Sequence, residues 1–271
     1  MGTLYLVATP IGNLEDITAR ALRTLREARL IAAEDTRRTG QLLVHFGIHT
    51  PLTSYFEHNK LNKIDNLLAA LEAGDVALVS DAGTPALSDP GYELVRAALE
   101  AGHRVTPIPG PSAIVAALVA SGLPTDAFVY LGFLPRKDAE RQQVLASVAR
   151  EQRTLVAYEA PHRLLDTLAA IESRLGDRRI AVARELTKLH EEIYRGPVSA
   201  ARTHFGAKEV LGEITLVIEG AAPEAQWDET RVRAELARLI HDGLKRKDAA
   251  RLVAELSGWP QREVYQLAIE K

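Results

Sequence analysis

Cysteine is absent from the 271 residues of this chain. Its absence excludes a disulfide framework, a thiolate metal site and a cysteine nucleophile, and it suits a cytosolic protein. The sequence also has no apolar run near the ~20 residues that a membrane-spanning helix needs, and its N-terminus has the pattern of a strand rather than of a signal peptide. We therefore expect a cytoplasmic protein that does not associate with a membrane.

An overall excess of positive charge is missing too, since the formal net charge is −3. This balance argues against a protein coated with positive charge, but the C-terminal end is locally basic. Residues 231–251 hold seven Lys and Arg against three Asp and Glu. Such a run is either a solvated helix face or a surface for an anionic partner.

Metal-ligand spacing occurs once, at His45 and His49, which are four residues apart. Gly47 lies between them and Pro51 follows, so this segment is expected to be a loop rather than a helix that presents both rings to a metal. We expect no metal site.

Strand-like apolar runs begin near Leu4, Leu30, Val76 and Val105, and helical patterns lie between them. This alternation predicts βαβ units and a mainly parallel sheet. A break at residues 122–126 separates an N-terminal α/β domain, 1–121, from a second α/β domain, 122–222. The strands expected in the second domain cover 128–131, 155–158, 180–183, 191–194 and 214–218, and their tighter spacing predicts some antiparallel pairs.

The tail, residues 228–271, is helical in pattern throughout. Its second half has the spacing of a helix-turn-helix, in which Gly258 makes the turn and Val264 packs the second helix back on the first. Two interpretations stay open: a module that binds nucleic acid, or a helix pair used for packing or dimerisation.

The loop at residues 80–91, Ser-Asp-Ala-Gly-Thr-Pro-Ala-Leu-Ser-Asp-Pro-Gly, follows a buried strand and precedes a helix. Ligands bind at such carboxyl ends of parallel strands, and glycine lets the backbone come close to them. Similar loops at 9–13, 34–37 and 109–112 follow the other strands. Four strand ends with unusual loops predict one crevice.

Other features of these loops leave alternatives open. The loop at 9–13 lacks the lysine of a P-loop and the third glycine of a dinucleotide fingerprint, so neither ligand is expected there. Arg37 could hold a phosphate, or could form a surface ion pair beside a helix cap from Asp35 or Thr36. Residues 55–60, Tyr-Phe-Glu-His-Asn-Lys, suit contact with a nucleotide base or the ordinary start of a helix.

Together the motifs resemble the tetrapyrrole methylase-like family of S-adenosylmethionine-dependent methyltransferases. Within it they are most similar to the branch that methylates the 2′-oxygen of a cytidine in small-subunit ribosomal RNA. The motifs span residues 3–220 in the family's order and comprise 8–14, 33–37, 54–59, 80–91, 109–113, 158–163 and 184–188.

The resemblance implies two α/β domains with S-adenosyl-L-methionine in the cleft between them, a helix-turn-helix tail, and a homodimer. It also implies 16S rRNA of the small ribosomal subunit, at a decoding-centre cytidine, as the substrate. The residues implied to bind the cofactor are Pro10, Asp81, Ala82, Gly83, Leu87, Ser112, Ala113, Glu159 and Leu186.

Methyl transfer of this kind needs an acceptor oxygen held in line with the sulfonium methyl group, and a base helps as charge develops. The candidate bases are Glu34, Asp35, His58 and Lys188, and the lysine would need a pKa lowered by burial. The candidate RNA-binding residues are Arg37, Asn59, Lys245, Arg246 and Lys247.

Two other functions remain under this fold. One is carbon methylation of a tetrapyrrole, against which the loops at 34–37 and 57–60 and the basic tail argue. The other is a non-catalytic RNA-binding assembly factor with a vestigial pocket, against which the intact loop at 81–84 argues.

Overall fold

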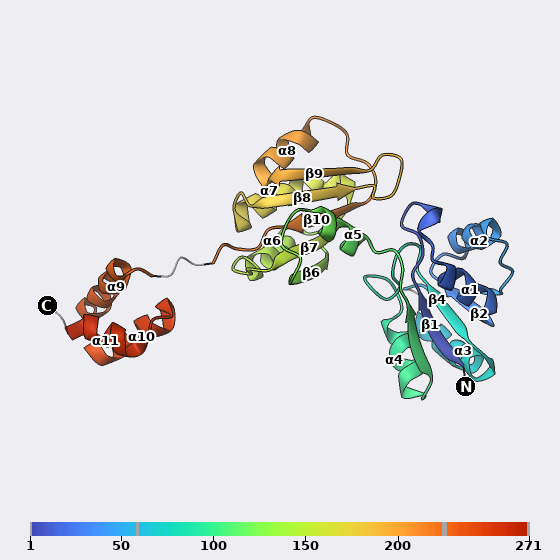
Figure 1. The fold of residues 1–271 in the computed structure, drawn as a ribbon, viewed down its shortest axis with the longest axis horizontal. Coiled ribbons are helices and arrows are strands. Elements are labelled where there is room, and N and C mark those ends of the chain that lie inside the picture. The colour runs from blue at the N-terminus through green and yellow to red at the C-terminus, as the bar shows by residue number, and fades with distance from the viewer. Residues whose placement is uncertain (1, 58–59, 224–226, 270–271) are drawn as a thin grey trace. The chain divides into compact units, whose positions relative to one another are not determined.

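The computed structural model describes residues 2–57, 60–223 and 227–269, and the chain forms two compact units, 1–221 and 222–271. The larger unit contains two five-stranded sheets (Figure 1). None of the helices within the described ranges is long and apolar enough to cross a membrane.

The first sheet is entirely parallel, with the order β3-β2-β4-β1-β5. Its strands are β1 (Thr3–Val7), β2 (Leu30–Ala33), β3 (Leu52–Ser54), β4 (Val76–Val79) and β5 (Arg104–Ile108). The predicted parallel βαβ alternation is confirmed. The sequence did not predict β3, because its three half-buried residues form no apolar run.

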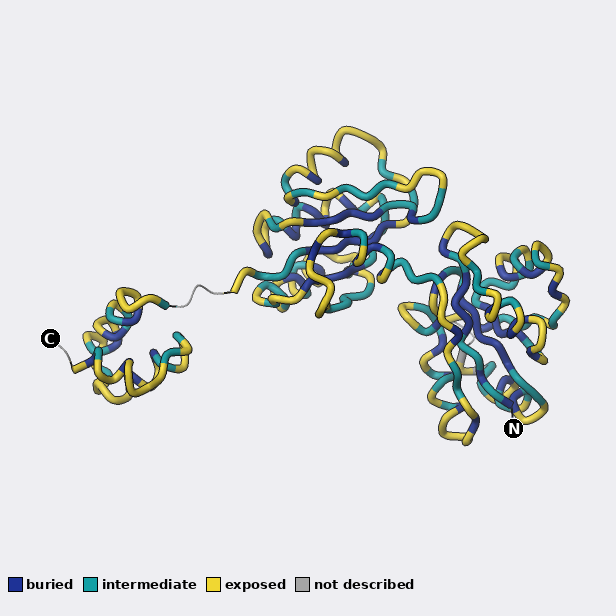
Figure 2. Tube along the Cα trace, in the orientation of Figure 1, coloured by how far each residue is buried: buried dark blue, intermediate teal, exposed yellow. Residues whose placement is uncertain are grey.

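Helices cover both faces of this sheet, which explains why its strands β2 and β4 are continuously apolar. They are α1 (Ala19–Glu27), α2 (Thr36–His45), α3 (Lys60–Ala73) and α4 (Tyr92–Glu100), and a short helix without buried residues, η1 (Leu14–Asp16), precedes α1. In β4, Ala77 and Val79 pack with α1 and α2, while Val76 and Leu78 pack with α3 and α4. Figure 2 shows the strands as the buried centre of this half.

The second sheet is mixed, with the order β6-β7-β10-β8-β9. Its strands are β6 (Phe128–Phe133), β7 (Thr154–Glu159), β8 (Arg179–Arg184), β9 (Glu192–Pro197) and β10 (Ile214–Ile218). Only β6 and β7 are parallel, and the other pairs are antiparallel, as the tight spacing predicted. One face packs against α6 (Asp138–Ser147), α7 (Leu164–Leu175) and α8 (Val198–Gly206), with the short helix η2 (Pro161–Arg163) before α7.

Helix α5 (Ala113–Ala120) covers the other face of the second sheet. Its Ile114, Ala117 and Leu118 share a core with Val156 and Val217. The helix thus begins directly after a loop of the first sheet and ends on the second. The domain boundary expected at 121/122 stays a prediction.

The smaller unit is a three-helix bundle of α9 (Glu229–His241), α10 (Arg246–Ser257) and α11 (Gln261–Ile269). Val232, Leu236, Val253 and Val264 form its core. Gly258 has a φ of 71° at the end of α10, so the turn before α11 uses the left-handed conformation that glycine permits. The predicted helix-turn-helix spacing is therefore confirmed.

Candidate active site

The strand-end loops of the first sheet meet at one edge because all its strands are parallel. Thr9 and Gly83 exchange two backbone hydrogen bonds, 2.9 Å from Thr9 N to Gly83 O and 3.0 Å from Gly83 N to Thr9 O. The Thr9 hydroxyl also donates to the Ser80 carbonyl oxygen at 3.3 Å. The loops after β1 and β4 are thereby fixed to one another.

A cavity of about 380 Å³, here called the main cavity, opens beside these loops. Its volume lies within the range of about 300–1,000 Å³ that ligand pockets occupy. All four predicted loops contribute to it, and so do the strand ends of the second sheet. From the first sheet and its loops come Ile11, Glu34, Arg38, Asp81, Ala82, Gly83, Thr84, Leu87, Asp89, Ser112 and Ala113; from the second come Phe133, Tyr158, Glu159, Ala160, Pro161, Ala183, Leu186, Gly212, Glu213, Ile214 and Thr215.

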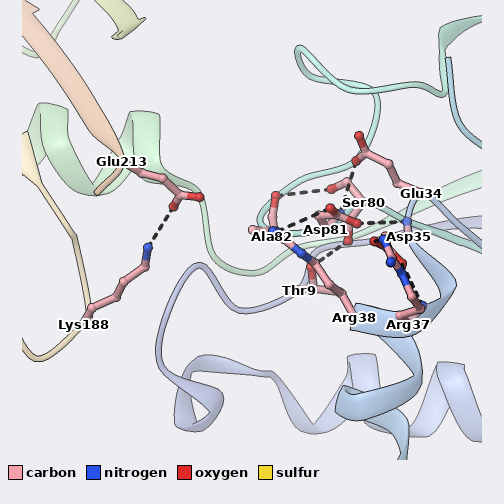
Figure 3. A network of polar contacts seen from close by, with 10 residues as sticks. All are labelled: Thr9, Glu34, Asp35, Arg37, Arg38, Ser80, Asp81, Ala82, Lys188 and Glu213. Atoms are coloured by element: carbon pink, nitrogen blue, oxygen red, sulfur yellow. Dashed lines mark hydrogen bonds and ion pairs between the residues drawn. The ribbon is translucent and has the colours of Figure 1, made fainter. Parts of the chain in front are cut away.

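Asp81 is the centre of a polar network at the rim of the main cavity (Figure 3). Its Oδ1 accepts a hydrogen bond from the Asp35 backbone N–H at 2.9 Å, and its Oδ2 lies 3.4 Å from the Arg38 guanidinium. Its own N–H donates to Glu34 Oε2 at 3.3 Å. The network therefore joins the loop after β4 to the loop after β2 and to the first turn of α2.

Carboxylates in the main cavity lie close to one another. Burial raises the pKa of Glu34, and the charge of Asp81 adds to the effect. Burial and the charge of Glu34 raise the pKa of Asp89 to about 6. Arg38 is the one arginine or lysine among the residues found to line the cavity. This excess of negative charge makes the main cavity complementary to a positively charged ligand.

Two loops carry left-handed residues in alternation. Ala86 and Ser88 have φ values of 67° and 65° on either side of Leu87. Glu185 and Thr187 have φ values of 52° and 67° on either side of Leu186. Such backbone is unfavourable for residues other than glycine, and it concentrates at functional sites. In both loops the leucine between the strained residues lines the main cavity.

Gly12 allows the loop after β1 to approach the loop after β8. A Cβ at this position would lie 2.8 Å from Thr187 Oγ1 and 3.1 Å from the Leu186 carbonyl oxygen, and it would overlap the Lys188 side chain. Any larger residue would force the two loops apart.

A second cavity of about 320 Å³, here called the α2 cavity, lies on the other side of Asp81. Arg38 and Asp81 line both cavities. The remaining residues of the α2 cavity come from the loops after β1 and β4, from η1, and from one side of α2: Thr9, Pro10, Leu14, Thr39, Gln41, Leu42, His45 and Ser80.

Residues 3–202 match the family of tetrapyrrole (corrin/porphyrin) methylases. The chain belongs to the tetrapyrrole methylase family. Residues 226–271 match a second family, the RsmI C-terminal HTH domain.

Full-length relatives place the chain within one branch of the tetrapyrrole methylase family. Proteins named ribosomal RNA small subunit methyltransferase I are 54% identical in Synechocystis sp., over 100% of this chain and 98% of the relative, and 49% identical in Halalkalibacterium halodurans, over 98% and 94%. The Escherichia coli O157:H7 protein of that name is 47% identical over 100% of this chain and 96% of its own. The predicted family and branch are confirmed.

Solved structures agree in fold at much lower identity. A crystal structure of the methyltransferase CobJ is 19% identical with a TM-score of 0.62 and covers 83% of this chain and 97% of its own. Uroporphyrin III C-methyl transferase from Thermus thermophilus is 22% identical with a TM-score of 0.57, over 80% and 97%. At this identity the likeness supports the tetrapyrrole methylase fold alone.

Eight of the nine residues predicted to bind the cofactor line the main cavity: Asp81, Ala82, Gly83, Leu87, Ser112, Ala113, Glu159 and Leu186. Pro10 lies instead in the wall of the α2 cavity. The Glu159 carboxylate is 1% exposed and binds internal partners, namely the Ala160 N–H, the Thr167 hydroxyl and the Arg163 guanidinium. Glu159 therefore shapes the wall, and its carboxylate is already engaged.

The predicted bases differ in how the structure holds them. Glu34 lines the main cavity with a raised pKa. Hydrogen bonds from Arg37 hold the pKa of the half-buried Asp35 down to about 2, so Asp35 has little affinity for a proton. Burial lowers the pKa of Lys188, but hydrogen bonds to Glu185 and Glu213 outweigh it and raise the pKa above its ordinary value. Lys188 is thus held as an ammonium group, whereas a base must be neutral.

Arg37 and Asp35 adopt the arrangement of a helix cap with an ion pair. Asp35 Oδ1 accepts from the Arg37 N–H at 2.8 Å, and its Oδ2 pairs with the Arg37 guanidinium at 2.7 Å. The Arg37 side chain is 87% exposed and lines neither cavity. A phosphate contact from Arg37 stays a prediction. His58 and Asn59, a predicted base and a predicted RNA contact, lie outside the described residues.

Arg38 and Asp89 were not singled out from the sequence, although both lie in segments that were. Arg38 follows Arg37, and only the helical phase of α2 shows that the second arginine, not the first, faces the cavities. Asp89 is the second acid of the loop after β4. Its burial, which no local pattern predicts, is what sets it apart.

In the smaller unit the predicted basic residues are accessible. Lys245, Arg246 and Lys247 are all exposed at the start of α10. No group of three or more histidines or acids that could hold a metal ion occurs in residues 2–57, 60–223 and 227–269.

Proposed function

We propose that this protein transfers the methyl group of S-adenosyl-L-methionine to the 2′-oxygen of a decoding-centre cytidine in 16S rRNA of the small ribosomal subunit. The observation that carries the proposal is full-length identity of 47–54% to proteins named ribosomal RNA small subunit methyltransferase I. Carbon methylation of a tetrapyrrole finds support in the name of the matching family and in structures at about one fifth identity, which carry the fold and not the substrate.

The main cavity fits the cofactor in both charge and surface. The carboxylates of Glu34, Asp81 and Asp89 suit the positive sulfonium and ammonium groups, and Ile11, Leu87 and Leu186 offer apolar surface to the adenine and the thioether chain. When bound, S-adenosyl-L-methionine supplies a methyl group already activated by the positive sulfur. The residues implied to hold it at the methionine end are Asp81, Ala82, Gly83 and Leu87.

The work left to the chain is to position the acceptor and to remove its proton. The bound cofactor would supply its methyl carbon to the ribose 2′-oxygen, and its sulfur would keep the electron pair of the carbon–sulfur bond that breaks. The 2′-hydroxyl proton passes to the Glu34 carboxylate. A raised pKa suits this role because a base works best when its pKa approaches the operating pH.

The remaining rate enhancement comes from orientation, since oxygen and methyl carbon must lie roughly 3 Å apart and in line with the sulfur. Asp81 is held by the Asp35 N–H and by Arg38, so the side chains beside the reacting atoms are fixed before substrate arrives.

The tail contributes RNA affinity in this proposal. Exposed Lys245, Arg246 and Lys247 would contact phosphates, and the match to an HTH domain supports that use of the bundle. A homodimer is also proposed. Val115 and Val119 on α5 are 53% and 68% exposed, and a second copy would cover such apolar side chains.

Methyl transfer is tested by incubating the full-length protein with S-adenosyl-L-methionine labelled in the methyl group and with small subunits that lack this methylation. Nuclease digestion and nucleoside analysis then identify the product. We expect label in 2′-O-methylcytidine, more from intact subunits than from a short cytidine oligonucleotide, because contacts to folded rRNA position the ribose.

Label on a base, or no transfer to RNA by protein that binds S-adenosyl-L-methionine in calorimetry, would contradict the proposal. Transfer to a porphyrinoid in a parallel reaction would assign the protein to tetrapyrrole methylation instead. Protein that does not bind S-adenosyl-L-methionine at all would be an assembly factor with a vestigial cavity.

A further inference from the structure

The α2 cavity has no role in binding the cofactor as described above, yet it adjoins the cofactor's proposed site. Arg38 and Asp81 form a wall common to both cavities. Glu34, whose carboxylate accepts the Asp81 N–H, lies on the main-cavity side of this wall. A ligand in the α2 cavity would therefore have to extend past Asp81 to reach the main cavity and the proposed base.

The chemistry of the α2 cavity differs from that of the main cavity. Asp81 is the one carboxylate among the residues found to line it, and Arg38 and His45 offer positive or proton-donating groups. The Arg38 side chain is 65% exposed and lies 3.4 Å from Asp81, so most of its guanidinium is available to another partner. This balance suits an anionic or neutral ligand rather than a cation.

The shape of the lining suits a nucleotide. Pro10, Leu14 and Leu42 provide apolar surface against which a base or a ribose can pack. Gln41, which is exposed on α2, offers an amide that both donates to and accepts from the polar edge of a base. The volume of about 320 Å³ lies at the small end of the range of ligand pockets, as one nucleotide requires.

We infer that the α2 cavity receives the acceptor nucleotide of the RNA, with Arg38 directed at its phosphate and Gln41 at its base. The inference rests on the proposed function and adds to it a place for the substrate. It makes Arg38 and Gln41 positioning and specificity residues, distinct from the residues that hold the cofactor. It also gives Pro10 a role on the acceptor side of the wall.

Substitution of Gln41 is the sharpest test, because this residue lines the α2 cavity alone and is exposed in the free protein. Gln41→Trp fills the cavity, and Gln41→Ala opens it while removing the amide. Gln143→Trp is the matched control, since Gln143 is exposed on α6 and lines neither cavity. All three variants are made in the full-length chain.

For Gln41→Trp we expect kcat/KM with unmethylated small subunits to fall at least tenfold, with unchanged calorimetric affinity for S-adenosyl-L-methionine and unchanged Tm. Gln41→Ala is expected to raise KM for the subunit with a smaller effect on kcat. Gln143→Trp should match the wild type in every measurement. A second readout is photocrosslinking with subunits that carry 4-thiouridine at the target position, which should label the peptide of residues 38–45.

Full activity in Gln41→Trp, or a crosslink confined to other peptides, would overturn the inference while the wild type continues to methylate the ribose. Loss of S-adenosyl-L-methionine affinity in Gln41→Trp would also overturn it, because the α2 cavity would then belong to the cofactor site. Failure of the wild type to methylate RNA would instead overturn the proposed function, and the inference with it.

Discussion

Gly83 offers a test in which backbone strain and cavity filling can be separated. Its φ of 78° is left-handed, and both its N–H and its C=O are hydrogen-bonded to Thr9. A Cβ would lie 3.4 Å from Ile11 Cγ2 and 3.8 Å from the Pro111 carbonyl oxygen, which are ordinary contacts. The cost of Gly83→Ala is therefore conformational rather than steric.

The left-handed conformation costs a residue with a Cβ about 1–2 kcal/mol. A change of 1 kcal/mol shifts Tm by about 2–4 °C for a unit of 150–250 residues, so Gly83→Ala should lower Tm by roughly 2–8 °C. Gly83→Val adds two methyl groups beside the methionine end of the proposed site. We expect it to abolish S-adenosyl-L-methionine binding without unfolding the chain.

The assay is calorimetric binding of S-adenosyl-L-methionine together with thermal melting of the same samples. Gly206→Ala is the matched control, because Gly206 lies at the end of α8, has no left-handed φ and has open space around its Cβ position. It should leave both measurements nearly unchanged. Normal affinity in folded Gly83→Val would remove this loop from the cofactor site, and an unchanged Tm in Gly83→Ala would refute the strain argument.

Three other substitutions test the base, the carboxylate cluster and the tail. Glu34→Gln should lower kcat at least tenfold at neutral pH with little change in S-adenosyl-L-methionine affinity. If the variant had the same single-turnover rate as the wild type, Glu34 would be excluded as the base. Folding raises the pKa of Asp89 from 3.8 to about 6. Between these pH values the folded protein keeps a proton that the unfolded chain has lost, so the stability of the folded protein falls as pH rises from about 4 to about 6. Asp89→Asn should accordingly raise Tm relative to wild type more at pH 7.5 than at pH 4, and an equal difference at both would contradict the assignment. Charge reversal at Lys245, Arg246 and Lys247 should flatten the salt dependence of RNA binding and leave S-adenosyl-L-methionine affinity intact, whereas an unchanged slope would assign the tail to packing or dimerisation.

The sequence predicted the fold well where hydrophobic periodicity carries the information. The starts of β2 and β4 and both bounds of β10 were predicted as observed, because buried strands are continuous apolar runs. The short strand β3 escaped, since three half-buried residues give no such run. The gathering of four loops at one edge followed from parallel topology, and the main cavity bears it out.

Side-chain roles were less predictable, because they depend on facts that no local pattern contains. Adjacent arginines 37 and 38 look equivalent in the sequence, but the helical phase of α2 gives one to Asp35 and the other to the two cavities. Lys188 was a candidate base, but Glu185, three residues away, and Glu213, which is distant in the sequence, both accept hydrogen bonds from its ammonium group. The burial of Asp89 and the presence of the α2 cavity depend on how distant segments pack, so neither could be predicted from the sequence.

The paired left-handed residues around Leu87 and Leu186 have a consequence for protein engineering. Replacing Ala86, Ser88, Glu185 or Thr187 with glycine relieves strain in the native state, but it also gives the unfolded chain more freedom. A search for thermostable variants would thus find little gain at these sites, and any gain would come with leucines less firmly aimed at the cavity. At these four positions we expect a substitution that raises Tm to lower kcat. A library varied at these positions alone would therefore measure how much activity is lost for a given gain in Tm in this fold.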